Sequence, residues 1–170
     1  MVMSKIRQNI PKETVLTYRD NQDAYTRKVS AAENVDHVVE LQLVDFAAGA
    51  IVEKNAALQK NLSQVVNAVC NLNVTSQKIN QSKKGPFTAS LNRLKKGVEH
   101  IDCDELARKG RARWLVDDGT WDKIKEETVL SFDAMSESLA DRVLTRAHAK
   151  TLDEATEAVR DVLEKIKIYS

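Results

Sequence analysis

The spacing of hydrophobic and polar residues changes several times along this chain, and each change predicts a different element. Residues 14–18 and 25–29 are rich in β-branched and aromatic residues, and the polar residues 20–23 between them favour a turn. We therefore predict two strands there. Residues 34–39, Asn-Val-Asp-His-Val-Val, predict a further short strand.

From residue 41 to 69 the apolar residues recur at threes and fours, which predicts helix with a break or kink near Gly49 and Asn55. Residues 72–74 are again extended in pattern. Ser76 is a suitable N-cap for a helix beginning near Gln77. We expect Gly85 and Pro86 to stop that helix, because proline lacks the donor that a helix interior needs.

The last third of the chain is helical in pattern. Apolar stripes run through residues 121–143 and 152–166, where they predict packing faces, and Thr151 with Glu154 matches a capping box. A turn at residues 117–119 favours a boundary. The predicted fold class is α+β and mostly helical, with residues 1–118 as one domain that has a helical insertion at 41–69. We predict residues 119–170 to be a C-terminal helical hairpin packed on it.

Composition narrows the class without assigning a function. The chain has 170 residues, of which 42% are hydrophobic and 30% charged, so it can bury a core and is unlike a disordered chain. Five glycines and two prolines argue against an all-β sandwich, which needs many turns. Cys70 and Cys103 lack metal-ligand spacing, and we expect two reduced thiols. The formal net charge of +1 favours no class of partner, so local clusters must carry that argument.

Two segments contain residues suited to phosphodiester chemistry. Asp36 and His37 stand together at a predicted strand end, and residues 71–83 offer an extended piece followed by a helix with Asn80. Oxygen ligands suit Mg²⁺ or Mn²⁺, which neutralises charge on a scissile phosphate, and a neutral imidazole can take a proton from water. Adjacent strand residues point to opposite faces, so both side chains reach one cavity only if the strand twists or ends there.

In these segments the chain resembles the HNH, or ββα-metal, nuclease family. Asp36-His37 followed by apolar residues is similar to the first element of the family motif, Asn71-Leu72 to the middle one, and Asn80 followed by Lys83 to the third. The resemblance spans roughly residues 35–84. The chain is also similar to the nuclease-like C-terminal domains of some crinkler-type effectors.

The resemblance implies a small ββα-metal core and a role for each matching residue. Asp36 and Asn80 would bind Mg²⁺ or Mn²⁺, His37 would be the general base, and Asn71 would organise the loop. The 33 residues between His37 and Asn71 exceed the usual loop, which leaves Asn73 as an alternative organiser. Glu40 is either a further ligand or an exposed carboxylate.

Basic residues downstream of the motif predict a phosphate-binding surface, with a solvated charged face as the alternative. The predicted nucleic-acid-binding residues are Lys83, Lys84, Arg93, Lys95, Lys96, Arg108, Arg111 and Arg113. DNA is the preferred partner, since the family mostly cuts DNA and no aromatic platform for RNA is evident. With no apolar N-terminal stretch or membrane span, we expect an intracellular and, from residues 108–113, a nuclear location, unless the chain is part of a longer secreted or translocated protein.

The function that these residues predict is metal-dependent endonuclease activity. One alternative is a degenerate HNH domain that binds nucleic acid or a protein without cutting. A second alternative is a helical interaction module in which Asp36-His37 is a coincidence. That module predicts continuous helix through residues 70–85, whereas the nuclease predicts strand and then helix.

Overall fold

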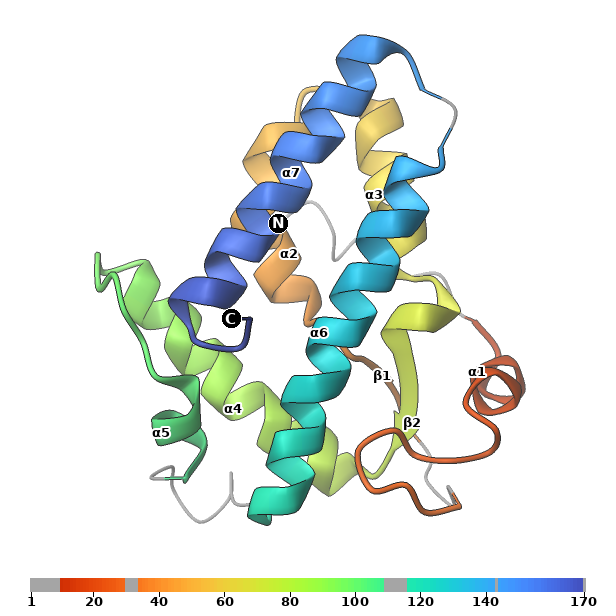
Figure 1. Ribbon diagram of the computed structural model, residues 1–170, viewed down its shortest axis with the longest axis vertical. Helices are drawn as coiled ribbons and strands as arrows, with labels where there is room; N and C mark the ends of the chain where they lie inside the picture. Colours follow the sequence, from red (N-terminus) through yellow and green to blue (C-terminus); the bar gives the residue numbers. More distant parts are fainter. Residues whose placement is uncertain (1–9, 30–33, 109–115, 143, 170) are drawn as a thin grey trace.

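The computed structural model describes residues 10–29, 34–108, 116–142 and 144–169, which adopt an α+β, mostly helical fold (Figure 1). None of the helices in these four ranges has the length and apolar character needed to cross a membrane. The elements in chain order are α1 (Lys12–Tyr18), β1 (Asn34–His37), α2 (Leu41–Val52), α3 (Ala56–Val66), the 3₁₀ helix η2 (Val69–Asn71), β2 (Leu72–Thr75), α4 (Gln77–Leu94), α5 (Cys103–Arg108), α6 (Asp118–Ala140) and α7 (Arg146–Lys165).

The two strands form an antiparallel pair in which Asp36 lies opposite Asn73 and His37 opposite Leu72. Strands at both positions were predicted, and both are confirmed. Ser76 then caps α4, because its hydroxyl accepts a hydrogen bond from the Ile79 amide. Strand followed by helix at residues 70–85 is not the continuous helix that the interaction module required.

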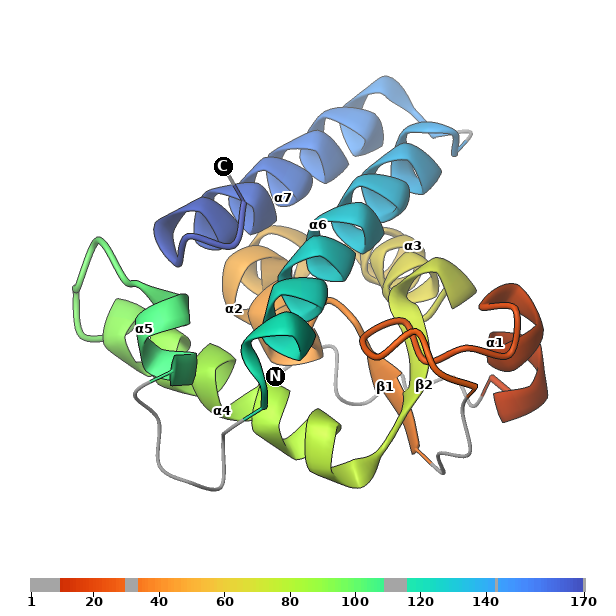
Figure 2. The ribbon, with the colours of Figure 1, turned by 60° about the horizontal axis from the view of Figure 1, so that its bottom comes forward.

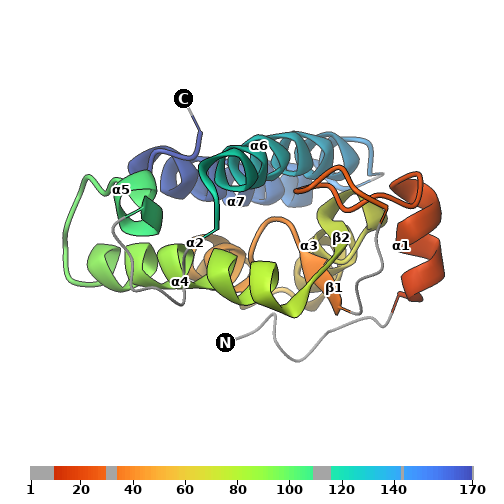
Figure 3. The ribbon, with the colours of Figure 1, turned by 90° about the horizontal axis from the view of Figure 1, so that it is seen from below.

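Helices α6 and α7 form a layer over the rest of the fold, as Figures 2 and 3 show from two directions. Helix α7 packs on α2, and α6 packs on η2 and α3. The largest cluster of buried side chains draws on elements from both parts of the predicted domain division, including Val38, Leu43, Trp121, Phe132 and Leu163. The helical layer therefore shares its core with the part that contains the strands.

The prediction of strands at residues 14–18 and 25–29 is wrong. The first segment is helix α1, and the second makes only an isolated bridge between Val29 and Gln22. Val15 is fully buried in a small cluster with Leu72 and Val74, and the side chain of Arg19, the C-cap of α1, donates hydrogen bonds to the carbonyl oxygens of Leu72 and Cys70. Tertiary packing of this kind overrides a modest β-propensity.

Helix α4 continues through Gly85 and Pro86, contrary to the predicted stop. Glycine lacks the Cβ that would clash with the proline ring, which reduces the penalty at the preceding residue. Fully buried Phe87 then packs beside Trp121, with ring centroids 6.2 Å apart, and stabilises the second half of the helix.

The helical boundaries elsewhere were predicted in part. Asn55 does separate α2 from α3 and caps α3, whereas Gly49 lies inside α2 without a break. The capping box expected at Thr151 is wrong, because α7 begins at Arg146 with Thr145 as its N-cap. Thr151 instead donates its hydroxyl to the carbonyl oxygen one helical turn earlier.

Candidate functional site

Asp36 lies in a buried polar cluster between β1 and α4. Its carboxylate Oδ2 accepts a hydrogen bond from the Tyr25 hydroxyl at 2.9 Å and forms an ion pair with Lys83 Nζ at 2.6 Å. The Lys83 side chain is fully buried, and that of Asp36 is 2% exposed. The antiparallel pairing of β1 with β2, followed at once by α4, brings residues 36 and 83 together.

Lys83 is bound on several sides. Its ammonium donates to the carbonyl oxygens of His37 and Val38 and to the Tyr25 hydroxyl, and it lies 3.1 Å from Glu40 Oε1. The Lys83 ammonium thus has the carboxylates of both Asp36 and Glu40 within ion-pair distance. The phosphate-binding role of Lys83 stays a prediction, and in this structure its ammonium is fully buried. Glu40 is likewise buried rather than an exposed carboxylate.

The electrostatics of this cluster favour a charged lysine. Burial alone would lower the pKa of Lys83, but the carboxylates of Asp36 and Glu40 raise it well above its usual value. Burial raises the pKa of Glu40, and the Lys83 ammonium opposes that shift.

His37 has a different partner from Asp36. Its Nε2 is 3.1 Å from Asn67 Oδ1, and the Asn67 amide donates to the Ser63 carbonyl oxygen at 2.8 Å. That second bond orients the amide so that its oxygen faces the ring, and His37 Nε2 must then be the protonated nitrogen. In a neutral ring Nδ1 carries the lone pair, as a general base requires. The side chains of Asp36 and His37 thus contact different elements, as expected for neighbours in a strand.

Asn71 is fully buried and holds the segment that follows Asp36-His37. Its side-chain oxygen accepts from the Val39 amide at 2.6 Å, and its amide donates to the carbonyl oxygens of Val39 and Val66. Asn73, the alternative organiser, instead accepts from the Ala24 amide and donates to Asp23. Of the two, Asn71 is the residue bonded directly to the segment after His37.

Asn80 lies in the first turn of α4, three residues before Lys83 on the same face of the helix. Its side-chain oxygen is buried and has no hydrogen-bond partner within the described ranges. Such an unpaired buried acceptor is costly, at about 1–3 kcal/mol, and needs an explanation. An asparagine on the exposed face of a helix would instead point its side-chain amide into water.

Asp36 and Asn80 are the candidate ligands for a divalent cation. No cluster of three His, Cys, Asp or Glu side chains that could hold a metal occurs in the described part of the chain. Magnesium, however, commonly uses one or two protein oxygens and completes its shell with water and phosphate. Asn80 Oδ1 is unpaired, and contacts to the Asp36 carboxylate from described residues all go to Oδ2. One oxygen on each residue therefore remains for an ion.

The remaining predicted nucleic-acid-binding residues are dispersed. Lys84 is exposed on α4, whereas Arg93, Lys95 and Lys96 are exposed at its far end. Arg108 forms ion pairs with Asp118 at 2.9 Å and Asp122 at 3.7 Å. Arg111 and Arg113 lie outside the described residues.

Tyr25, Glu40 and Asn67 complete the polar groups around Asp36 and His37, and sequence reasoning missed Tyr25 and Asn67. Tyr25 was read as a strand residue, and Asn67, the C-cap of α3, belongs to no motif element. Glu40 carried a signal, since it follows the apolar pair after His37 at fixed spacing.

No family model, no curated protein and no solved structure matches the chain.

Proposed function

We propose that this chain is a metal-dependent nuclease of the HNH type that hydrolyses phosphodiester bonds, with DNA as the preferred substrate. The observation that carries the proposal is the unpaired, buried oxygen of Asn80 on the helix that also delivers Lys83 to Asp36. The resemblance of the sequence motif to the HNH family also implies a metal-binding role for this residue. A bound cation gives that oxygen a partner.

The order of elements supports the same proposal. Two antiparallel strands followed by a helix, β1, β2 and α4, is the order that a ββα-metal core requires. The hydrogen bonds between Asn71 and Val39 correspond to the role of the middle motif residue, which pins the loop after Asp-His. The long segment between the strands is accommodated as helices α2 and α3.

In this proposal Asp36 and Asn80 hold Mg²⁺ or Mn²⁺, and the ion supplies charge neutralisation at the scissile phosphate. His37 is the general base that takes the proton from the attacking water. Lys83 and Tyr25 hold Oδ2 of Asp36 and so orient the carboxylate.

The alternative is an HNH-like domain that binds nucleic acid without cutting it. The Lys83 ammonium, 2.6 Å from Asp36, favours this alternative because it already supplies a positive charge where the ion would bind. The Asn67 contact, which holds His37 away from the partners of Asp36, favours it as well.

A plasmid-nicking assay with Mg²⁺, Mn²⁺ or EDTA separates the two. The proposal expects metal-dependent nicking by the wild type. His37→Ala should lose about 100-fold in rate while it retains DNA affinity, because it removes a general base. Asn80→Ala should weaken Mg²⁺ or Mn²⁺ binding measured by calorimetry.

Matched controls are available for both positions. His100 is an exposed histidine, and Asn92 is an exposed asparagine of α4. His100→Ala and Asn92→Ala should nick like the wild type. Wild-type protein that binds DNA but never nicks it with either metal would overturn the nuclease and leave the binding domain.

A further inference from the structure

A second polar site lies on the other side of Tyr25. A cavity of about 550 Å³ opens between the loop at residues 25–28 and the first turns of α4 and α6. Tyr25 forms part of its wall, while the hydroxyl of the same residue bonds to Asp36 and Lys83. The cavity therefore adjoins the proposed nuclease site. Its volume lies within the usual range for small-ligand sites, about 300–1,000 Å³.

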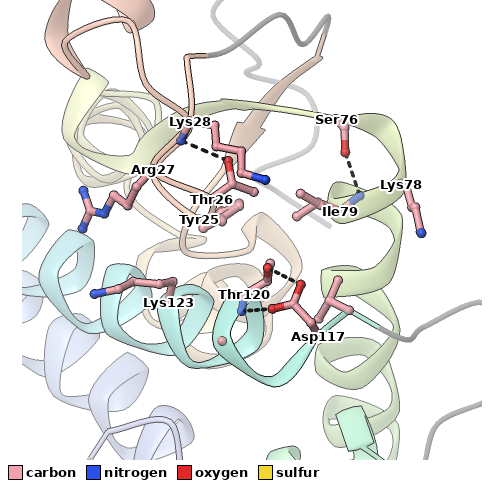
Figure 4. A pocket seen from close by; sticks show the side chains of 12 residues that line it. Tyr25, Thr26, Arg27, Lys28, Ser76, Lys78, Ile79, Asp117, Thr120 and Lys123 are labelled. Carbon is pink, nitrogen blue, oxygen red and sulfur yellow. Dashed lines mark hydrogen bonds between the residues drawn. The ribbon is translucent and has the colours of Figure 1, made fainter.

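Four cationic side chains line this cavity: Arg27, Lys28, Lys78 and Lys123. Figure 4 shows Lys28 projecting into the space between the three segments, with Arg27 and Lys123 at one margin and Lys78 at the other. The cations of this set come from three separate parts of the sequence, so no single motif encodes them. None of the four was predicted to bind nucleic acid.

Two of these cations have no ion pair within the described ranges. Arg27 pairs with Glu127 at 2.6 Å, and Lys123 pairs with Glu126. Lys28 and Lys78 are exposed and have no such partner among the described residues. The Lys28 charge acts on the Asp117 carboxylate without an ion pair between them, so both lysine ammonium groups can still contact a ligand.

The acidic residue in the cavity wall is already engaged. Both oxygens of Asp117 accept hydrogen bonds from Thr120, one from its amide at 2.9 Å and one from its hydroxyl at 2.7 Å. The dashed lines in Figure 4 mark these bonds. The Asp117 carboxylate thus faces the first turn of α6.

Two long helices also begin at this cavity. Ser76 and Lys78 belong to the start of α4, and Asp117 and Gly119 to the start of α6. A helix N-terminus carries a partial positive charge and free amide donors, which favour anions. The helix ends add to a site that the cationic side chains already define.

We propose that the cavity lined by Arg27, Lys28, Lys78 and Lys123 is a phosphate-binding subsite for a nucleic-acid strand. The phosphate is either a strand end or an internal phosphodiester next to the bond at Asp36. The inference rests on the proposed function only for its choice of nucleic acid as the source of phosphate. Binding at the cavity requires neither a metal ion nor cleavage.

The test is fluorescence anisotropy in EDTA with single-stranded DNA of about 12 nucleotides, a length within the range of single-strand binding sites. The strand is labelled at its 3′ end and carries either a 5′-phosphate or a 5′-hydroxyl. Lys28→Ala with Lys78→Ala is compared with Lys54→Ala with Lys60→Ala, a pair of exposed lysines of the α2–α3 region. The two double variants lose the same charge.

The cavity variant should bind at least about tenfold more weakly than the control variant. Its plot of log affinity against log salt should be shallower by about 1.4, since each lost single-strand phosphate contact removes about 0.7. A loss confined to the 5′-phosphorylated strand assigns the site to a strand end, whereas an equal loss for both strands assigns it to internal phosphates.

Equal affinity of the two double variants, or no binding by the wild type, would overturn the subsite. Because the assay contains no metal, the subsite and the nuclease fail independently. A protein that never nicks plasmid can still lose affinity on the Lys28 and Lys78 changes, and a nicking protein can be indifferent to them.

Discussion

Lys83 and Lys84 are neighbours in α4 with the same chemistry and opposite surroundings. Lys83 is fully buried against Asp36 and Glu40, and Lys84 is exposed to solvent. One faces the strands because it lies one turn after Asn80 on the inner side of the helix, and the other is rotated away by 100° per residue. The same contrast separates the buried cluster from the basic surfaces.

The contrast shows what a charge contributes in each setting. A buried ion pair is costly to break because the remaining group keeps its charge without water, whereas an exposed lysine is hydrated and screened. Lys83 therefore acts on the stability and orientation of Asp36. Exposed lysines act on the affinity for a polyanion.

The largest predicted effect is on the free energy of unfolding of Lys83→Met. Removal of the ammonium leaves the buried carboxylate of Asp36 uncompensated, so we expect a loss of about 3–5 kcal/mol. Lys84→Met should change stability by less than about 0.5 kcal/mol. Urea denaturation followed by circular dichroism measures both.

A double-mutant cycle sharpens this prediction. Asp36→Asn combined with Lys83→Met removes both charges, so the double variant should be more stable than the sum of the single losses implies. Additive losses would show that the ion pair does not couple the two residues.

The second effect concerns the asparagine that clamps the segment after His37. Asn71→Ala removes three side-chain hydrogen bonds to backbone groups of Val39 and Val66, and we expect a loss of about 2–3 kcal/mol, since unsatisfied buried groups cost about 1–3 kcal/mol. Exposed Asn92, changed to alanine, is the matched control. A loss below about 0.5 kcal/mol for Asn71→Ala would count against a clamping role.

Strands β1 and β2, the Ser76 cap and the apolar stripes of α6 and α7 were predictable because each depends on local spacing or on one side chain. Helix α1 was not, since its contacts with the sheet, through Val15 and Arg19, come from residues distant in the sequence. Helix α4 continues past Pro86 for a similar reason, the burial of Phe87.

The candidate site also has a part that the sequence predicts and a part that it does not. The motif spacing predicted roles for Asp36, His37, Asn71 and Asn80. In the described structure the Asn71 side chain is hydrogen-bonded to the segment after His37. The spacing could not show that Lys83 turns inward, because a difference of one residue in helix phase decides between burial and exposure. Nor could it show the contact of Tyr25 with Asp36, which depends on the path of a loop.

A third prediction follows from the raised pKa values in the buried cluster. Burial and the Asp36 carboxylate raise the pKa of Tyr25 well above 10.0, and Asp36 and Glu40 raise that of Lys83 well above 10.5. Both groups stay protonated in the folded state after they would titrate in the unfolded chain. Their contribution to stability is therefore complete below about pH 10 and is lost as the pH rises toward the folded values.

Tyr25→Phe tests this directly. The variant should lose stability less steeply than the wild type between pH 10 and 11, because Lys83 then remains without Tyr25 as a titrating group of the buried cluster. Tyr18→Phe, a change at an exposed tyrosine, should keep the wild-type slope. Cys103, whose pKa burial raises to about 12, contributes equally to all three proteins and cancels from the comparison. Identical slopes for Tyr25→Phe and the wild type would show that Tyr25 does not contribute to the pH dependence of stability.

The smallest predicted effect concerns the exposed lysines and arginine of the original basic prediction. Lys84, Arg93, Lys95 and Lys96 line α4 and its end, and Lys78 of the cavity lies about 22 Å from Arg93 along the helix at 1.5 Å per residue. A strand that occupies the cavity reaches the far end of α4 only if it is several nucleotides long. We therefore expect replacement of Lys84, Arg93, Lys95 and Lys96 by alanine to weaken the binding of long duplex DNA. Each phosphate contact that is lost should lower the salt slope by about 0.9.

The length dependence distinguishes this surface from the cavity. The same fourfold variant should bind a short strand of about 4 nucleotides, the lower limit of single-strand sites, as the wild type does, whereas the change of Lys28 and Lys78 should weaken binding at every length. Anisotropy titrations with strands of increasing length measure both responses. If the fourfold variant bound long duplex as tightly and with the same salt slope as the wild type, this end of α4 would be a solvated face. Phosphate binding would then be confined to the cavity beside Tyr25.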